Sequence, residues 1–405
     1  TNPIDSSLFE RQLNEVFTLH ENGDLDRAEA LYRQLIDRYP EIWQLHFNCG
    51  LLLFEASRHA EALEFYLGGL KINDGSEDLL FNTAICQKEL GLIEDAIHSY
   101  RRALDVAPDD IDCWYNLAGC YRTLCQDTLA TQIYIKILED NPRHLPSLNN
   151  LAYLTHKSGD DDQARKLYEQ ILEINPDHVS ADYMRAALSG ETRHQPPDSY
   201  IKEVFDAFAD HYDTSLTDTL GYDLPAALLE FYQRFFTDCE PKCFLDLGCG
   251  TGVVGEKFRS LCSSMTGVDI SSQMLAAARE KQLYESLHCS EIIEFLKTRH
   301  GSCYDLVVSR DELPYIGELK GLFTQVARIV SESGHFIFSV EHSPSAEPLP
   351  VLQKSGRFAH SRNYITDMAG RTGWHIVGQA ELDLRREREV WIQGAIYMMS
   401  RSILT

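Results

Sequence analysis

Residues 244–255 read FLDLGCGTGVVG, and this stretch decides the fold of the second half of the chain. The apolar run that ends at Leu247 predicts a buried parallel strand, and the apolar residues from Val253 onward predict a helix. Between them lies a turn where only glycine lets the backbone run close to a ligand, and it holds Gly248, Gly250 and Gly252. A dinucleotide loop has the spacing G-x-G-x-x-G, whereas the third glycine here comes one residue early and Asp246 precedes the loop. We therefore expect a ligand that carries an amine rather than two phosphates.

The elements after this loop alternate as in a doubly wound α/β sheet. We expect helices at 272–281, 291–298, 319–329 and 363–370. We expect strands at 265–270, near 287, and at 304–309, 334–341, 374–382 and 390–399. Asp269 stands at the C-terminal tip of its strand, where an acid accepts hydrogen bonds from both hydroxyls of a ribose. Ligands of such sheets sit over the C-terminal ends of the strands, so we expect the site at that edge.

Three motifs resemble those of class I S-adenosylmethionine-dependent methyltransferases: LDLGCGTG at 245–252, VDIS-x-x-ML at 268–275 and YDLVVSRDEL at 304–313. With the closing pair of strands, the resemblance covers residues 199–405. It implies a Rossmann-like sheet of strand order 3-2-1-4-5-7-6 and S-adenosylmethionine as the cofactor. It also implies a set of cofactor-binding residues: Tyr212, Asp246, Gly248, Cys249, Gly250, Gly252, Asp269, Ile270, Met274, Glu291, Ile292 and Ser309.

Within this set the resemblance implies separate roles. Asp246 and the glycine loop hold the methionine end of the cofactor, and Asp269 holds the ribose. Ile270 and Met274 pack against the adenine, although both read equally well as plain core residues. Glu291 falls where the family usually has an aspartate that accepts from the adenine N6, so it keeps the acceptor and adds a methylene.

A helical lid is implied before the sheet, over residues 199–238. The segment FDAFADHYD at 205–213 resembles that lid, whose Tyr212 closes over the cofactor; the alternative is an amphipathic helix that packs on the sheet. Further segments resemble a subgroup of methyltransferases that carry tetratricopeptide repeats: Asp311, 315–317, 339–341 and 356–364. The acceptors of that subgroup are largely undefined, so the resemblance indicates the reaction more than the acceptor.

The first half of the chain repeats itself every 34 residues. Alanine and tyrosine mark the period, as Ala28, Ala62, Ala96, Ala130, Ala164, Tyr32, Tyr66, Tyr100, Tyr134 and Tyr168. This step predicts five tetratricopeptide repeats of two helices each, because the alanine lets helices approach and the tyrosine fills the layer between them. We therefore predict an all-α solenoid at 1–190 that ends in a capping helix at 180–188, a linker at 191–198 and the methyltransferase domain at 199–405.

Asparagine recurs in the same period on the first helix of each repeat, beginning at Asn14. The candidate partner-binding residues are Phe47, Asn48, Phe81, Asn82, Tyr115, Asn116 and Asn150. First helices line the concave face of such arrays, and a side-chain amide matches the peptide unit of an extended chain because it offers a donor and an acceptor together. The series resembles the asparagine ladder of O-linked N-acetylglucosamine transferase, which holds substrate polypeptide. The alternative is that each amide bonds the neighbouring helix.

Composition narrows the classes of function. The formal charge of −25 over 405 residues repels phosphate backbones, so we expect no nucleic-acid partner. No apolar run has the length of a membrane span, and the N-terminus does not read as a signal peptide. The 11 cysteines are scattered without C-x-x-C spacing, which indicates reduced thiols and a cytoplasmic location. Cys239 and Cys243 have no matching second pair, so we expect no metal; the sequence does not indicate an oligomeric state.

Candidates for an acceptor-side base are few. His342 stands at the tip of the fifth strand, and His360 and Tyr364 lie in the insertion beyond it, where a solvated loop residue is the alternative. Arg310 is placed to steer an acceptor carboxylate. The amide-methylating signature Asn/Asp-Pro-Pro-Tyr is absent from the end of the fourth strand.

Three functions are consistent with these features. The first is a methyltransferase that acts on a protein or peptide held by the repeats, which the asparagine series favours. The second is a small-molecule methyltransferase whose repeats only tether it to a partner protein. The third is a cofactor-binding scaffold without activity, against which the intact glycine loop, Asp269 and the lid argue.

Overall fold

The computed structural model describes residues 6–208, 223–236, 242–301, 303–343, 349–387 and 390–402. The chain forms two compact units, residues 1–154 and 155–405. This division falls within a helix of the last repeat, ahead of the predicted linker. The domain boundaries at 190 and 199 stay a prediction.

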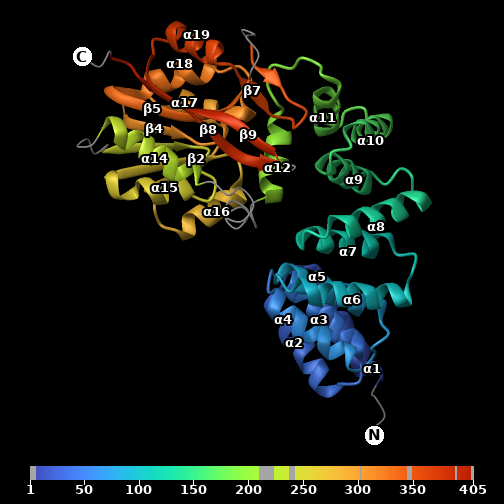
Figure 1. The fold of residues 1–405 in the computed structure, drawn as a ribbon. Coiled ribbons are helices and arrows are strands. Elements are labelled where there is room, and N and C mark those ends of the chain that lie inside the picture. The colour runs from blue at the N-terminus through green and yellow to red at the C-terminus, as the bar shows by residue number, and fades with distance from the viewer. Residues whose placement is uncertain are drawn as a thin grey trace. The chain divides into compact units, whose positions relative to one another are not determined.

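The first unit is a series of paired helices (Figure 1). Its helices are α1 (Ser6–Glu21), α2 (Leu25–Arg38), α3 (Trp43–Glu55), α4 (His59–Leu70), α5 (Glu77–Glu89), α6 (Ile93–Val106), α7 (Ile111–Thr123), α8 (Asp127–Asp140) and α9, which starts in this unit (Leu145–Ser158). The repeated alanines and tyrosines of the first four repeats lie in this unit, where Ala62 and Tyr66 are fully buried. In three successive repeats an aromatic residue of the first helix lies at a ring-centroid distance of 5.9 Å from the tyrosine of its own repeat, as Phe81 does from Tyr100. The helical array expected from the period is confirmed.

Further helices and a sheet make up the second unit. The helices are α10 (Asp161–Ile174), α11 (Val179–Ser189), α12 (Asp198–Phe208), α14 (Leu224–Phe235), α15 (Val253–Phe258), α16 (Ser272–Glu280), α17 (Ile292–Thr298), α18 (Lys320–Ile329) and α19 (Arg362–Arg371), with 3-10 turns η2 (Arg259–Leu261) and η3 (Leu313–Tyr315). The strands are β1 (Cys243–Leu247), β2 (Ser264–Asp269), β3 (Ser286–Cys289), β4 (Tyr304–Ser309), β5 (Val330–His342), β6 (Val351–Leu352), β7 (Phe358–His360), β8 (His375–Glu387) and β9 (Val390–Ser400).

The sheet has the expected strand order. β3, β2, β1, β4 and β5 are parallel neighbours, and β9 pairs antiparallel with both β5 and β8. The doubly wound class is therefore confirmed. Two differences from the expectation stand out: β5 begins at Val330 rather than 334, and the loop after β5 contains the hairpin β6–β7, which joins the end of β5.

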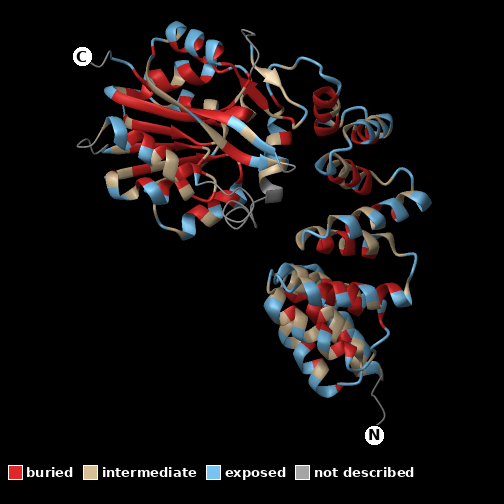
Figure 2. Ribbon diagram, in the orientation of Figure 1, coloured by how far each residue is buried: buried red, intermediate tan, exposed pale blue. Residues whose placement is uncertain are grey.

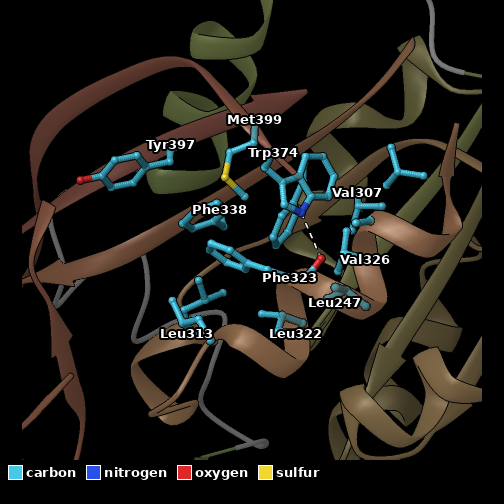
Figure 3. Close-up of a cluster of buried hydrophobic side chains, with 14 of the residues drawn as sticks. Leu247, Val307, Leu313, Leu322, Phe323, Val326, Phe338, Trp374, Tyr397 and Met399 are labelled. Carbon is cyan, nitrogen blue, oxygen red and sulfur yellow. Dashed lines mark hydrogen bonds between the residues drawn. The ribbon is translucent and has the colours of Figure 1, made fainter. Parts of the chain in front are cut away.

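Helices cover both faces of the sheet (Figure 1). On one face α17, α18 and α19 enclose a core in which Trp374 Nε1 donates a hydrogen bond to the carbonyl oxygen of Phe323 (3.0 Å; Figure 3). On the other face α14 and α15 pack Leu228 and Phe258 against the strands. The central strands β1, β4 and most of β5 are buried, as Figure 2 shows, because helices cover each face, whereas the edge strand β3 is partly exposed.

All cysteines in the described part of the chain are free. Six are buried: Cys49, Cys86, Cys113, Cys120, Cys249 and Cys262. Burial raises the pKa of the Cys113 thiol to about 12, so this thiol stays protonated at neutral pH. The exposed ones are Cys125, Cys289 and Cys303, while Cys243 is partly buried.

Candidate functional site

The glycine loop after β1 has left-handed backbone at all three glycines. The φ angles of Gly248, Gly250 and Gly252 are 73°, 52° and 89°. The backbone N–H groups of Gly248 and Cys249 donate to the carbonyl oxygen of Val268 at 2.8 and 2.9 Å. The loop is thereby tied to the end of β2, and its backbone conformation disfavours a side chain at each of the three glycine positions.

Asp246 is a buried carboxylate directly before this loop. It lies in β1 between β2 and β4 and is fully buried. Its Oδ2 accepts a hydrogen bond from the hydroxyl of Tyr284 (2.6 Å), whereas its Oδ1 has no partner in the described structure. Burial raises the pKa of Asp246 to about 7, and the negative charge of Asp269 adds to the rise. An unsatisfied carboxylate oxygen of this kind fits an ammonium donor.

Asp269 joins the glycine loop to the helix that follows β2. Its Oδ2 accepts from the backbone N–H of Gly250 and its Oδ1 from that of Ser271, each at 2.8 Å. The side chain therefore sits beside the loop at the carboxyl edge of the sheet, as its position in the sequence predicts. Its role toward a ribose hydroxyl stays a prediction.

The other residues expected to bind the cofactor differ in how far they are exposed to solvent. Cys249, Met274, Ile292 and Ser309 are buried, and Ser309 Oγ donates to the carbonyl oxygen of Leu247 (3.2 Å). Ile270 is partly exposed, at the end of β2. Tyr212 lies outside the described residues. The cofactor contacts expected for these side chains stay predictions.

Glu291 has a structural role in this chain. Its carboxylate accepts from the backbone N–H of Glu294 (2.7 Å) and so caps the N-terminus of α17. A cap of this kind satisfies one of the donors that a helix leaves unpaired at its start. The predicted contact with the adenine would have to use the remaining acceptor capacity of the same carboxylate.

Two residues of the site were not found from the sequence. Tyr284, which holds Asp246, precedes β3, and a Cβ added to Gly255 would overlap its hydroxyl. Glu312 lies over the glycine loop, because a Cβ added to Gly248 would overlap its Cγ and Cδ. The signal for Glu312 was its place in YDLVVSRDEL, three residues after the strand next to β1.

The two base candidates of the insertion lie inside the protein. His360 is fully buried, and its Nε2 is 2.9 Å from the carbonyl oxygen of Gly317. Burial lowers the pKa of His360 to about 4, which keeps the ring neutral. Tyr364 accepts from the backbone N–H of Leu319 through its hydroxyl (2.8 Å). These contacts favour a structural role for both, and the base role stays a prediction.

His342 and Arg310 lie nearer the edge of the sheet. His342 ends β5, opposite His360 in β7, and is half-buried. Arg310 is buried, and its positive charge lowers the pKa of Asp246 and of Glu312. The guanidinium therefore lies close enough to Asp246 and Glu312 to interact with them electrostatically, and its role toward an acceptor carboxylate stays a prediction.

A buried ion cluster occupies the same edge of the sheet, after β4 and β5. Arg385 donates from Nη1 to Asp311 Oδ1 (2.8 Å), from Nε to Glu387 Oε1 (2.7 Å) and from Nη2 to Glu341. Arg357 donates from Nε to Glu341 Oε1 (2.6 Å) and also contacts Glu387. The cluster fixes the end of β5, β8 and the start of β7 to the loop after β4.

The asparagine series has two kinds of local partner. Asn82 and Asn116 donate from Nδ2 to the carbonyl oxygen four residues earlier in their own helices, at 2.8 and 2.9 Å. Asn150 instead links helices, since it donates to the hydroxyl of Tyr115 (3.0 Å) and accepts from Arg122 Nη1 (2.5 Å). Asn48 is half-buried.

Among the described residues, no group of three or more His, Cys, Asp or Glu is arranged to hold a metal ion. None of the helices described has both the length and the apolar character that a membrane crossing requires.

Comparison with known families assigns both halves of the chain. Residues 245–338 match a family model described as a methyltransferase domain. Models of the tetratricopeptide repeat match residues 19–77, 78–110 and 145–178. The methyltransferase match contains the glycine loop and Asp269. The repeat matches contain Asn48, Asn82 and Asn150 of the asparagine series.

Individual proteins resemble this chain over part of its length, and at low sequence identity. A ubiquinone biosynthesis O-methyltransferase of Cronobacter sakazakii is 28% identical over 101 residues, which is 24% of this chain and 42% of that protein. The chain thus spans less than half the length of this curated relative. Magnesium protoporphyrin IX methyltransferase of Synechocystis PCC 6803, solved with bound SAH, has a TM-score of 0.39 at 15% identity and covers 51% of this chain and 99% of its own. The MamA protein has a TM-score of 0.40 at 17% identity and covers 41% of this chain and 91% of its own.

The family matches agree with the motifs and with the sheet order. The chain therefore carries an S-adenosylmethionine-dependent methyltransferase domain, C-terminal to tetratricopeptide repeats.

Proposed function

We propose that the chain transfers the methyl group of S-adenosylmethionine to a protein or peptide acceptor that the first helices of the repeats hold. Asp246 carries the cofactor part of this proposal, because a fully buried carboxylate with an oxygen that has no described partner fits the cofactor's ammonium group. Asp269 would hold the ribose, and the backbone of the glycine loop would lie against the methionine end. The bound cofactor supplies an activated methyl group; the protein orients the acceptor and excludes water.

The acceptor part of the proposal is supported by Asn82 and Asn116. Each amide stands at the same position of successive repeats and makes the same bond to its own helix. An amide that donates one N–H in this way retains its second N–H and its carbonyl oxygen. Two such groups one repeat apart suit the backbone of an extended peptide.

Small-molecule methylation is the second candidate. The relative from Cronobacter sakazakii is named for ubiquinone biosynthesis, which favours a small acceptor. In this chain the side-chain amide of Asn150 is already hydrogen-bonded to Tyr115 and Arg122. It is therefore less suited than Asn82 and Asn116 to bind the backbone of a peptide. The repeats would then tether the enzyme to a partner protein.

Methyl-labelled S-adenosylmethionine distinguishes these candidates. We propose incubating the full chain with the label and cell lysate, and then separating protein from extractable small molecules. Label in protein that falls in the Asn82→Ala/Asn116→Ala variant supports the peptide acceptor. The matched control is Asn22→Ala, an exposed asparagine in the turn between α1 and α2. Label confined to the small-molecule extract would replace the first proposal by the second.

A further inference from the structure

Glu312 lies against the first glycine of the loop. A Cβ placed on Gly248 would overlap the Cγ, Cδ and Oε1 atoms of Glu312, so its carboxylate rests on the backbone of that glycine. No base or cofactor role is assigned to Glu312 by the motifs, and it stands on the loop after β4 rather than on the strands that carry Asp246 and Asp269. The sheet brings all three carboxylates to one edge.

The backbone before Glu312 is held in an unusual conformation. Asp311 has a φ of 59°, which is rare for a residue with a side chain. Its N–H donates to Ser339 Oγ (3.0 Å) and its carboxylate accepts from Arg385 (2.8 Å). These contacts fix the direction in which the chain enters Glu312, and such over-determined strain is common at functional sites.

The carboxylates of Asp246, Asp269, Asp311 and Glu312 lie close enough beside the glycine loop to interact electrostatically. Burial raises the pKa of Glu312, and the charges of Asp269, Asp311 and Asp246 raise it further, while the charge of Arg310 opposes the rise. Asp311 is paired with Arg385, whereas Asp246 and Glu312 share the opposing charge of Arg310. Asp246 is fully buried with Oδ1 unpartnered, which independently indicates that a cationic ligand completes this site.

The cofactor and its product differ in charge at one atom. S-adenosylmethionine carries a positive sulfonium and a positive ammonium, whereas the demethylated product keeps only the ammonium. We propose, on the basis of the proposed function, that Glu312 is a cofactor-binding residue that attracts the sulfonium and makes the site prefer S-adenosylmethionine over S-adenosylhomocysteine. Loss of the sulfonium charge on transfer then weakens the hold on the product and favours its release.

Calorimetry on the full chain with the two ligands tests this preference. The wild-type chain should bind S-adenosylmethionine more tightly than S-adenosylhomocysteine. Glu312→Gln should weaken the binding of S-adenosylmethionine by about tenfold and that of S-adenosylhomocysteine by less than about twofold, because a charge-assisted contact is lost for only the first ligand. Glu318→Gln, an exposed glutamate of the same loop, is the matched control and should change neither. Glu312→Ala repeats the comparison if the Gln variant fails to fold.

Three results would overturn the inference or its basis, and they are distinguishable. Equal losses for both ligands would place Glu312 at the shared ammonium group instead. Unchanged binding of both ligands, with loss of turnover, would make Glu312 an acceptor-side residue. Failure of the wild-type chain to bind either ligand would contradict the proposed function itself.

Discussion

The hydroxyl of Tyr284 donates a hydrogen bond of 2.6 Å to Oδ2 of Asp246. The phenol of Tyr284 packs against two glycines on its way to this buried carboxylate. A Cβ added to Gly255 would overlap the hydroxyl, and one added to Gly267 would lie 3.2 Å from the ring. Asp246 is thus held from one side by the protein and keeps its other oxygen for a ligand.

Tyr284→Phe should destabilise the methyltransferase domain. The change leaves a second oxygen of a buried carboxylate without a donor, which costs about 1–3 kcal/mol of unfolding free energy. Urea unfolding measures the loss. Tyr66→Phe is the control, because its buried hydroxyl has no partner in the described structure and should be lost without cost. Equal effects of the two substitutions would show that the bond to Asp246 adds nothing to stability.

Cofactor affinity should rise with pH through neutrality. Asp246 has a pKa of about 7 in the folded chain, where Asp269 and Glu312 add negative charge, Arg310 adds positive charge and Tyr284 donates a hydrogen bond. A cationic ligand binds the ionised carboxylate, so affinity falls by up to about tenfold per pH unit below that pKa. Calorimetry with S-adenosylmethionine at several pH values measures this, and Asp246→Asn should flatten the profile and lower affinity.

The same substitution should stabilise the free protein in alkaline solution. The pKa of Asp246 is raised above its ordinary value, so its ionisation in the fold is unfavourable and stability declines as the pH rises toward about 7. Removing the charge should increase the melting temperature above that pH by about 2–4 °C. A lower melting temperature for Asp246→Asn at every pH would contradict the burial of an uncompensated charge.

His360 should make the domain sensitive to acid. Its pKa is lowered to about 4 by burial, so the stability it contributes is present above its ordinary pKa of about 6.5 and is lost as the pH falls toward 4. His360→Gln keeps an N–H donor for Gly317 and does not titrate, so its melting temperature should fall less on acidification. His300→Gln, at an exposed histidine, is the control and should follow the wild type. A loss of turnover in His360→Gln at unchanged stability would instead support the base role.

The asparagine series should separate into two groups. Asn150→Ala removes bonds to Tyr115 and Arg122 and should lower the stability of the repeats by about 1–2 kcal/mol. Asn82→Ala/Asn116→Ala removes only bonds within single helices and should unfold close to the wild type. Thermal unfolding followed by circular dichroism compares them. Early melting of the double variant would mean that these amides also hold the array together.

Much of the fold follows from patterns that recur in the sequence. The 34-residue period predicts the array because the same burial is required in every unit, as the fully buried Ala62 and Ala96 show. The hairpin β6–β7 was not predicted, since its strands have two and three residues and no apolar run. It exists because β7 pairs with the end of β5. The start of β5 was missed because Ser331, Glu332 and Ser333 are polar.

The candidate site could be predicted only in part, because some of its contacts depend on how the strands pair. Asp246 and Asp269 are found because each directly adjoins a recognisable turn or strand end. Glu312 and Tyr284 reach Gly248 and Asp246 through the pairing of β1 with β2 and β4, which no local pattern encodes. His360 reads as a loop residue, but the pairing of β7 with β5 encloses it.

The thiols of the chain form a ready set of chemical reporters. Burial keeps most of them protonated and out of contact with reagents, so an alkylating probe applied to the native protein should modify chiefly the exposed ones. One of these, Cys289, lies 3.6 Å from the carbonyl oxygen of Ile270, at the end of the strands where the adenine is expected. Its rate of alkylation should therefore fall when the cofactor site fills, so occupancy is readable by mass spectrometry without an added label.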